Sequence, residues 1–259
     1  MNKLHIVSSG SKANAYIIES NGEMLLIDQG LSFKQFLSRC DELGIDHGKI
    51  KAILVTHEHS DHVVGVSFTA KKLGIPIYST EKTIEVVKGK DRYCNEFKQV
   101  EKDRVFKISG FDCVPFSTVH DAVDPVGYNI TLNGEEILCF ATDTGRVTTR
   151  MMSYIALSDH IILEANHDHA MLYRNARYPA DLKARIRSGK GHLSNDQSFE
   201  AIERISGKCP KTIVFSHLSE ENNSPDIIFN MAHDFKKRKR LLFNCFVAKQ
   251  EEPFSVLLI

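Results

Sequence analysis

Three histidines and an aspartate stand within six positions of this sequence, directly after a short apolar segment. They are His57, His59, Asp61 and His62, and residues 52–55 before them form a strand-like, aliphatic run. Because the end of a strand is held rigidly, the turn after it can direct all four side chains into one small volume. A lone histidine is more often a surface residue, but imidazoles and a carboxylate at this spacing are typical metal ligands. The pattern predicts a metal site, and two ions fit it better than one.

Length and composition are those of a soluble globular protein. The chain has 259 residues, of which 42% are hydrophobic and 25% charged, so disordered and fibrous classes are excluded. We expect one domain over residues 1–259. The formal net charge is zero, which argues against a protein coated in positive potential but not against one basic patch beside a substrate groove.

The sequence contains no clear signal peptide, membrane span or disulfide pattern. The first eight residues are too short and interrupted for a signal peptide, and no apolar run approaches the roughly 18 residues of a membrane span. We therefore expect a cytoplasmic protein that contacts no membrane. The six cysteines contain no Cys-x-x-Cys pair, which favours reduced thiols over disulfides or a zinc knuckle.

Apolar periodicity divides the chain into two halves of similar organisation. Strand-like segments fall at 4–8, 15–19, 24–28, 75–79, 105–108, 113–119, 126–132, 137–141, 161–164 and 211–215. Helical periodicity covers 31–43, 63–73, 81–88, 147–157, 178–187, 195–205 and 226–237, and the polar stretch 89–104 reads as a surface excursion. Runs of strands followed by helices predict an α/β (α+β) protein with two sheets packed face to face and helices outside.

Further ligand-type residues stand at the ends of the predicted strands. They are Asp28, His120, Asp143, Glu164 and His217. Asp28, close in the same sheet to the histidine cluster, either supports a ligating histidine or caps the following helix. Side chains that can bind metal ions or transfer protons therefore stand at the ends of several predicted strands.

The segment from His57 to His62, followed by His120, Asp143 and His217, resembles the signature of the metallo-β-lactamase fold. The resemblance implies a four-layer αβ/βα sandwich with a dimetal site at the sandwich edge. It implies that one metal is held by His57, His59 and His120, a second by Asp61, His62 and His217, and that Asp143 bridges them. This ligand set is similar to that of the hydrolytic, phosphodiesterase-type branch, whereas the β-lactamases themselves generally have a cysteine in place of Asp143.

Five further stretches are similar to the YycJ (WalJ) family of bacterial metal-dependent nucleases. They lie at 9–16, 120–128, 164–168, 191–195 and 217–223, and Lys12 and Ala13 depart from the usual serine and glycine of the first one. The resemblance implies a 5′-to-3′ exonuclease on double-stranded DNA with a part in mismatch repair. The expected partner is therefore nucleic acid, most of all DNA.

A more distant resemblance, to the tRNA 3′-processing endonuclease, implies a catalytic pair at Glu164 and His192 that protonates the leaving oxygen. The long arm with which that enzyme grips tRNA has no evident counterpart here, so RNA processing ranks second. A thioester or lactone hydrolase on the same scaffold is a third possibility, and a non-catalytic metal-binding regulatory protein is a remoter one.

The expected mechanism is in-line hydrolysis of a phosphodiester at two divalent metal ions, for which this ligand set accepts zinc, manganese or iron. Asp61 and Asp143 would orient the nucleophile, and His192, held by Glu164, would act as the general acid. Ser11 and Asn14 could contact the substrate phosphate. The basic run at 236–240 could contact DNA or form the solvated end of a helix. The sequence makes no prediction of oligomeric state.

Overall fold

Two seven-stranded sheets form the centre of the computed structural model, which describes residues 1–205 and 209–259. The first sheet has the order β14-β1-β2-β3-β4-β5-β6 and the second β13-β12-β11-β10-β9-β8-β7. The strands of the first sheet are β1 (Asn2–Ser8), β2 (Ala15–Ser20), β3 (Glu23–Ile27), β4 (Ile50–Leu54), β5 (Ile77–Ser79), β6 (Phe97–Gln99) and β14 (Phe254–Leu258). Those of the second are β7 (Phe106–Ile108), β8 (Phe111–Ser117), β9 (Val126–Leu132), β10 (Glu136–Ala141), β11 (His160–Glu164), β12 (Thr212–Ser216) and β13 (Asn244–Val247).

The two sheets repeat one arrangement. In the first, β14, β1, β2 and β3 pair antiparallel, and β3, β4, β5 and β6 pair parallel. In the second, β7 to β10 pair antiparallel, and β10 to β13 pair parallel. This confirms the two similar halves that the sequence predicts.

Alternation along the strands builds separate apolar layers. In β2, Tyr16 and Ile18 point between the sheets while Ile17 points to the outer face, and in β10 Phe140 and Cys139 divide in the same way. Successive strand side chains face opposite sides, so each sheet is apolar on both faces. Each outer face therefore needs a cover.

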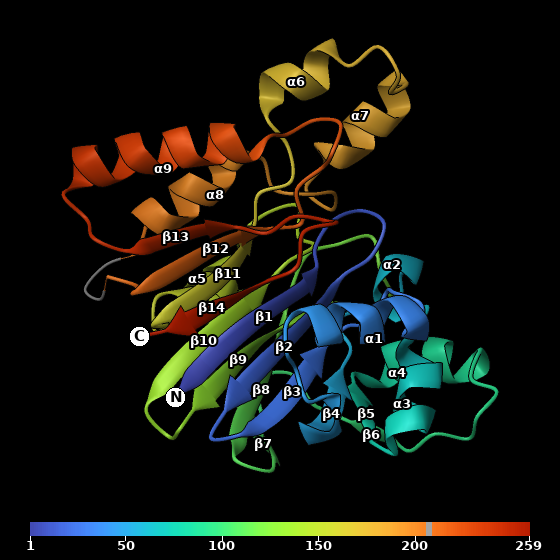
Figure 1. Ribbon diagram of the computed structural model, residues 1–259. Helices are drawn as coiled ribbons and strands as arrows, with labels where there is room; N and C mark the ends of the chain where they lie inside the picture. The colour runs from blue at the N-terminus through green and yellow to red at the C-terminus, as the bar shows by residue number, and fades with distance from the viewer. Residues whose placement is uncertain (206–208) are drawn as a thin grey trace.

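Helices supply that cover. The helices are α1 (Phe33–Glu42), the short 3-10 helix η1 (His47–Lys49), α2 (Ser60–Val63), α3 (Val66–Leu73), α4 (Glu81–Gly89), α5 (Thr149–Ile155), α6 (His169–Arg174), α7 (Ala180–Ile186), α8 (Asn195–Glu203) and α9 (Pro225–Lys239). Phe36 of α1 and Val66 of α3 pack on the first sheet, and Phe199 of α8 and Ile228 of α9 on the second. Figure 1 shows the resulting helix, sheet, sheet, helix order, so the expected four-layer αβ/βα sandwich is confirmed.

Two local predictions were wrong. The helix expected at 63–73 begins three residues later, as α3 at Val66, because the chain turns at Val64 and Gly65 and Val63 belongs to the separate turn α2. A Cβ on Gly65 would lie 2.1 Å from the carbonyl oxygen of Leu31, so only glycine permits this close approach. The polar stretch at 89–104 contains an edge strand, β6, whose three residues are too few to show a period.

The end of the chain returns to its beginning. β14 pairs with β1, with Val256 opposite Leu4. Just before β14, the Gln250 amide donates hydrogen bonds to Ser8 Oγ (2.7 Å) and the Ala13 carbonyl (3.0 Å). The loop after β1 is therefore fixed by residues that come almost last in the sequence.

The described helices include none that is long and apolar enough to cross a bilayer. All six cysteines are free in the structure.

Candidate metal centre

The histidine segment lies where β4 ends. After Leu54 the chain leaves the sheet, His59 precedes the single turn of α2, and Asp61 and His62 lie within that turn. His59 makes no capping hydrogen bond through its side chain, so its imidazole is free to turn toward the other ligands. Asp61 benefits from the unsatisfied backbone N–H groups of the turn.

Three imidazoles converge at one place. Nε2 of His57 lies 3.1 Å from Nδ1 of His59, and the ring centres of His57 and His59 lie 5.1 and 5.0 Å from that of His120. His120 comes from beyond β8, and its Nδ1 donates to the Gly191 carbonyl at 3.1 Å, which leaves Nε2 for the cluster. One ring nitrogen from each histidine lies within 4.8 Å of the others.

A second group forms around Asp61, His62 and His217. The Nε2 atom of His62 lies 3.3 Å from Asp61 Oδ2, and His217 Nε2 lies 3.9 Å from the same oxygen. These three residues also place one potential ligand atom each within 4.8 Å of one another. His217 directly follows β12, so the two sheets both contribute to this group.

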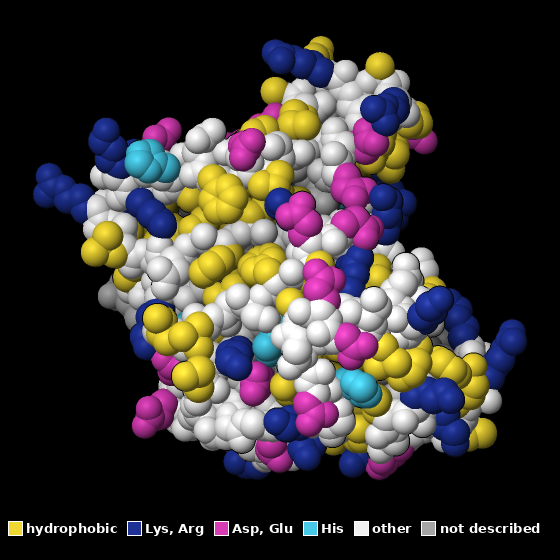
Figure 2. All heavy atoms as spheres, in the orientation of Figure 1, with side chains coloured by type: hydrophobic (Ala, Val, Ile, Leu, Met, Phe, Trp, Pro, Cys, Tyr) yellow, Lys and Arg dark blue, Asp and Glu magenta, His cyan; other side chains and the backbone are white. Residues whose placement is uncertain are grey.

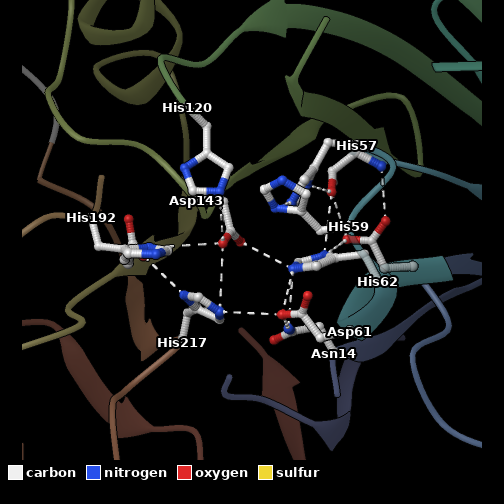
Figure 3. Close-up of polar contacts among 12 residues, drawn as sticks. Asn14, His57, His59, Asp61, His62, His120, Asp143, His192 and His217 are labelled. Atoms are coloured by element: carbon white, nitrogen blue, oxygen red, sulfur yellow. Dashed lines mark hydrogen bonds and ion pairs between the residues drawn. The ribbon is translucent and has the colours of Figure 1, made fainter. Parts of the chain in front are cut away.

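Asp143, at the end of β10, stands between the two groups (Figure 3). Its Oδ2 lies 3.4 Å from His62 Nε2, and its Oδ1 lies 3.5 Å from His217 Nε2 and 3.9 Å from His120 Nε2. Among the described residues neither Asp143 Oδ2 nor His217 Nε2 has a hydrogen-bond partner, although both are buried. Buried polar atoms without partners point to a missing ligand, and nitrogen and carboxylate donors suit divalent cations. The residues present therefore fit a metal centre.

Carboxylates set the protonation of His62. Burial by itself lowers the pKa of His62, but the charges of Asp143, Asp28 and Asp61 outweigh burial and raise that pKa well above the ordinary value. His57 behaves in the opposite way, because burial and the neighbouring histidines lower its pKa well below the ordinary value. Without a cation, His62, which lies among three carboxylates, therefore keeps its proton, and His57 is neutral.

His217 follows the same rule. Burial lowers its pKa, but Asp143, Asp61 and Glu164 raise it to about 10. The pKa of Asp61 falls far below its ordinary value, because His62 and His217 outweigh the opposing effect of burial. A divalent cation would take the place of these protons, since ligating histidines must be neutral.

Asp28 supports the histidine segment from behind. It follows β3, and its carboxylate accepts hydrogen bonds from His62 Nδ1 (2.8 Å), the Thr56 amide (2.8 Å) and the Thr56 hydroxyl (2.7 Å). A carboxylate at Nδ1 fixes the tautomer so that Nε2 faces the cluster. The sequence allows Asp28 either to cap the following helix or to support a ligating histidine. The cap of α1 is Ser32 and not Asp28, so the structure favours the second interpretation.

Glu164 organises the other sheet's contribution. This buried residue accepts from His192 Nδ1 at 2.6 Å and from His217 Nδ1 at 2.9 Å through one oxygen. Its other oxygen accepts from the amides of Thr144 (2.9 Å) and Leu193 (3.2 Å). The pKa of Glu164 is held well below its ordinary value by these partners, against the effect of burial. The ionised carboxylate can only accept, so Nδ1 of His192 carries the proton and Nε2 is the ring's remaining nitrogen.

Strained backbone accompanies the ligands. Asp28, Asp143 and His217 have φ values of 55°, 54° and 54°, in the left-handed region that non-glycine residues rarely occupy. Each such residue costs about 1–3 kcal/mol and persists only where the surroundings dictate it. Three of the nine described non-glycine residues with positive φ thus stand at strand ends that aim side chains at the cluster.

The cluster opens into a pocket of about 300 Å³. One side, here called the ligand side, consists of His59, Asp61, His120, Asp143, His192 and His217. The other, here called the arm side, consists of Tyr178, Leu182, Arg185 and Ile186, from α7 and the residue before its N-terminal proline. No sequence pattern places α7 at the site, because these residues match no motif.

The two weaker candidates lie differently. Ser11 lines the pocket, whereas Asn14 is buried and its side-chain amide lies 3.3 Å from Asp61 Oδ2 and 3.1 Å from His62 Nε2. The Asn14 amide N–H also donates to the Asp61 carbonyl at 2.8 Å. The structure thus places Asn14 where it positions Asp61, and a contact between Ser11 and substrate stays a prediction.

Comparison with known proteins gives a consistent picture. Residues 23–218 match the family model described as the Beta-lactamase superfamily domain. Exodeoxyribonuclease WalJ of Streptococcus pneumoniae is 36% identical over 231 residues, covering 87% of this chain and 84% of that protein. Exodeoxyribonuclease YycJ of Bacillus anthracis is 32% identical over 230 residues, covering 86% and 84%. Among solved structures, the metallo-beta-lactamase fold protein YhfI from Bacillus subtilis superposes with a TM-score of 0.70 at 18% identity, covering 98% of this chain and 99% of that one.

Proposed function

This chain belongs to the metallo-β-lactamase superfamily, and from that premise we propose that it is a metal-dependent exodeoxyribonuclease. The observation that carries the proposal is the position of His192. Its ring is held by Glu164 at 2.6 Å, lies 3.8 Å from Asp143 through Nδ1, and lines the same pocket as the ligand cluster. Similarity to two exodeoxyribonucleases over 84% of their length supports DNA as the substrate.

The ligand set supports a site for two divalent ions, one at His57, His59 and His120 and one at Asp61, His62 and His217, with Asp143 shared. When bound, such ions would supply Lewis-acid stabilisation of the charge that develops on the phosphate oxygens. The protein side chains orient the attacking water and transfer the protons.

Asp61 and Asp143 accept hydrogen bonds from the attacking water and orient it toward phosphorus, and one of these carboxylates takes the proton that the water loses. As the new P–O bond forms, the bond to the 3′ oxygen breaks, and that oxygen takes a proton from Nε2 of His192. Glu164 keeps the imidazole of His192 in place by accepting a hydrogen bond from Nδ1, which leaves Nε2 for the leaving oxygen. The product is a nucleotide with a 5′ phosphate.

We further propose that degradation runs from the 5′ end of double-stranded DNA and serves mismatch repair, as the resemblance to the nuclease family implies. The pocket of about 300 Å³ at the ligand cluster can receive the end of a strand. A raised spontaneous mutation rate in a deletion strain, restored by the wild-type gene but not by a D143A copy, is the expected result for the repair role.

Digestion of end-labelled substrates tests the activity. Double-stranded DNA, single-stranded DNA and RNA of one sequence are incubated with the protein and Mn²⁺ or Zn²⁺, with the label at either end. We expect 5′-labelled duplex to release labelled mononucleotide first, and 3′-labelled duplex to shorten progressively. Cleavage of RNA alone, internal DNA fragments at early times, or hydrolysis of a thioester but of no phosphodiester would each overturn the proposal.

A further inference from the structure

The segment 169–190, here called the arm, is far more basic than the rest of the chain. It carries Arg174, Arg177, Lys183, Arg185, Arg187 and Lys190 but one acidic residue, Asp181, whereas the whole sequence is neutral. Figure 1 shows α6 and α7 projecting beyond the sheets, and Figure 2 shows Lys and Arg side chains on that projection at the top of the view. The charge is thus local and outward-facing.

Packing does not explain the composition of the arm. α7 buries none of its residues, and α6 buries only Leu172. Tyr173 is 79% exposed. Arg174, Arg187 and Lys190 are exposed, and their side chains form no hydrogen bond or ion pair with the part of the chain that the structure describes. Three cations are therefore available to an external partner.

The arm is directly connected to the ligand cluster. Arg185 lines the pocket and pairs with Asp121 at 2.5 and 2.7 Å. Asp121 in turn lies 3.3 Å from His120 Nε2. At the other end of the arm, Lys190 precedes Gly191, whose carbonyl accepts from His120 Nδ1. A strand that reached the cluster would pass the free cations of the arm.

The basic end of α9 is partly neutralised by its own surroundings and lies away from the metal pocket. Arg238 lies 3.5 Å from Glu203, Lys239 also pairs with Glu203, and Lys236 lies 4.6 Å from the ring centre of Phe243. No residue of this end lines the metal pocket. Figure 2 shows it at the left of the view, away from the arm.

We propose that the arm binds the sugar–phosphate backbone of the DNA beyond the bond being cleaved, through Arg174, Arg187 and Lys190. The proposal rests on the proposed function for its substrate. The binding is electrostatic and sequence-independent, because each cation replaces counterions condensed on a phosphate. The end of α9 makes no such contact.

A charge-matched pair of variants tests this. R174Q/R187Q/K190Q removes three charges from the arm, and K237Q/R238Q/K239Q removes three from α9. The metal-loaded proteins are titrated onto a fluorescein-labelled duplex with phosphorothioate linkages, and anisotropy gives Kd over a series of KCl concentrations. Circular dichroism confirms folding, and R187Q/K190Q replaces the triple arm variant if that variant does not fold.

The arm variant is expected to bind about tenfold more weakly than wild type. The slope of log Kd against log salt concentration should be smaller by about 2.7, because each of the three lost phosphate contacts contributes about 0.9 to that slope. The double variant should lose about 1.8, and the α9 variant should match wild type. Equal losses in the arm and α9 variants, a loss in α9 alone, or no loss in the arm would overturn the proposal. Nucleotide release from unmodified duplex is measured in parallel, so a wild-type protein that binds but never cleaves would count against the proposed function and not against the arm.

Discussion

The two sides of the pocket are built in opposite ways. On the ligand side, Asp143 and His217 are buried at strand ends, and Glu164 holds His217 and His192 with one oxygen. On the arm side, α7 has no buried residue, and a surface ion pair from Arg185 connects it to the His120 loop. Packing thus fixes the ligand residues, whereas the contact with substrate that we propose depends on exposed charge, which tolerates a partner of variable sequence.

The sharpest test of the ligand side is Asp143→Ala. Asp143 lies against both groups, 3.9 Å from His120 and 3.4 Å from His62, so its loss removes several kcal/mol of charge stabilisation. We expect cleavage to fall by about 10³-fold or more and the metal content, measured by mass spectrometry, to fall with it. Unchanged metal content together with an unchanged rate would contradict the assignment.

His192→Ala separates proton transfer from metal binding. Because His192 delivers the proton to the leaving oxygen, kcat on DNA should fall about 10²–10⁴-fold. A diester of p-nitrophenol, whose leaving group departs without a proton, should be affected much less, and metal content should stay near that of wild type. Equal losses on both substrates would make His192 a structural residue of the ligand side.

Asp28→Asn tests support from behind the ligands. Asparagine keeps one acceptor oxygen, but it loses the negative charge and turns an NH2 group toward the donors of His62 or Thr56, so metal affinity should fall about 10–100-fold. Competition with a chromogenic chelator measures it. Asp112→Asn, which breaks only the surface pair with Lys107, serves as the control and should leave the affinity as it is.

The smallest effect is expected at His167, where the arm joins the ligand side. His167 is buried, neither ring nitrogen has a hydrogen-bond partner among the described residues, and burial lowers its pKa to about 4. The folded protein therefore resists protonation that the unfolded chain accepts below about pH 6.5. Stability is complete above that pH and declines as pH falls toward 4, by about 1–3 kcal/mol from this residue.

Urea unfolding of His167→Phe across pH 4–7 checks this sign. The variant keeps a ring but has nothing to titrate, so its stability should fall less steeply than that of wild type over the same range. Parallel curves would show that His167 is already satisfied in the native state.

The part of the site that lies in one continuous segment could be predicted from the sequence pattern alone, and the part that comes from distant segments could not. His57 to His62 could be found directly, because a strand and its turn bring consecutive residues together. Asp143 and His217 come from distant strand ends, and resemblance to a known family was needed to connect them. The sequence pattern does not identify the arm as basic, because its cations are scattered over 22 positions, from 169 to 190. The run at 236–240 is recognised instead because its cations are contiguous.

The layered fold followed from strand and helix periods, but the break at Gly65 did not. That break depends on a close approach to the Leu31 carbonyl, which is a contact between loops that no local pattern records. The left-handed backbone at Asp28, Asp143 and His217 is equally invisible, since tertiary packing imposes it.

Gln250 and β14 have a consequence for the order of events during synthesis. The loop that Gln250 fixes contains Asn14, which holds Asp61 through the backbone, and the strand before that loop pairs with β14. A ribosome releases β1 and the histidine segment long before residues 250–258 exist. Contacts at such sequence separation form late, so a nascent chain carries the ligand residues without the geometry to use them. The ligand cluster therefore reaches its final geometry only after synthesis has reached β14, the strand that completes the first sheet.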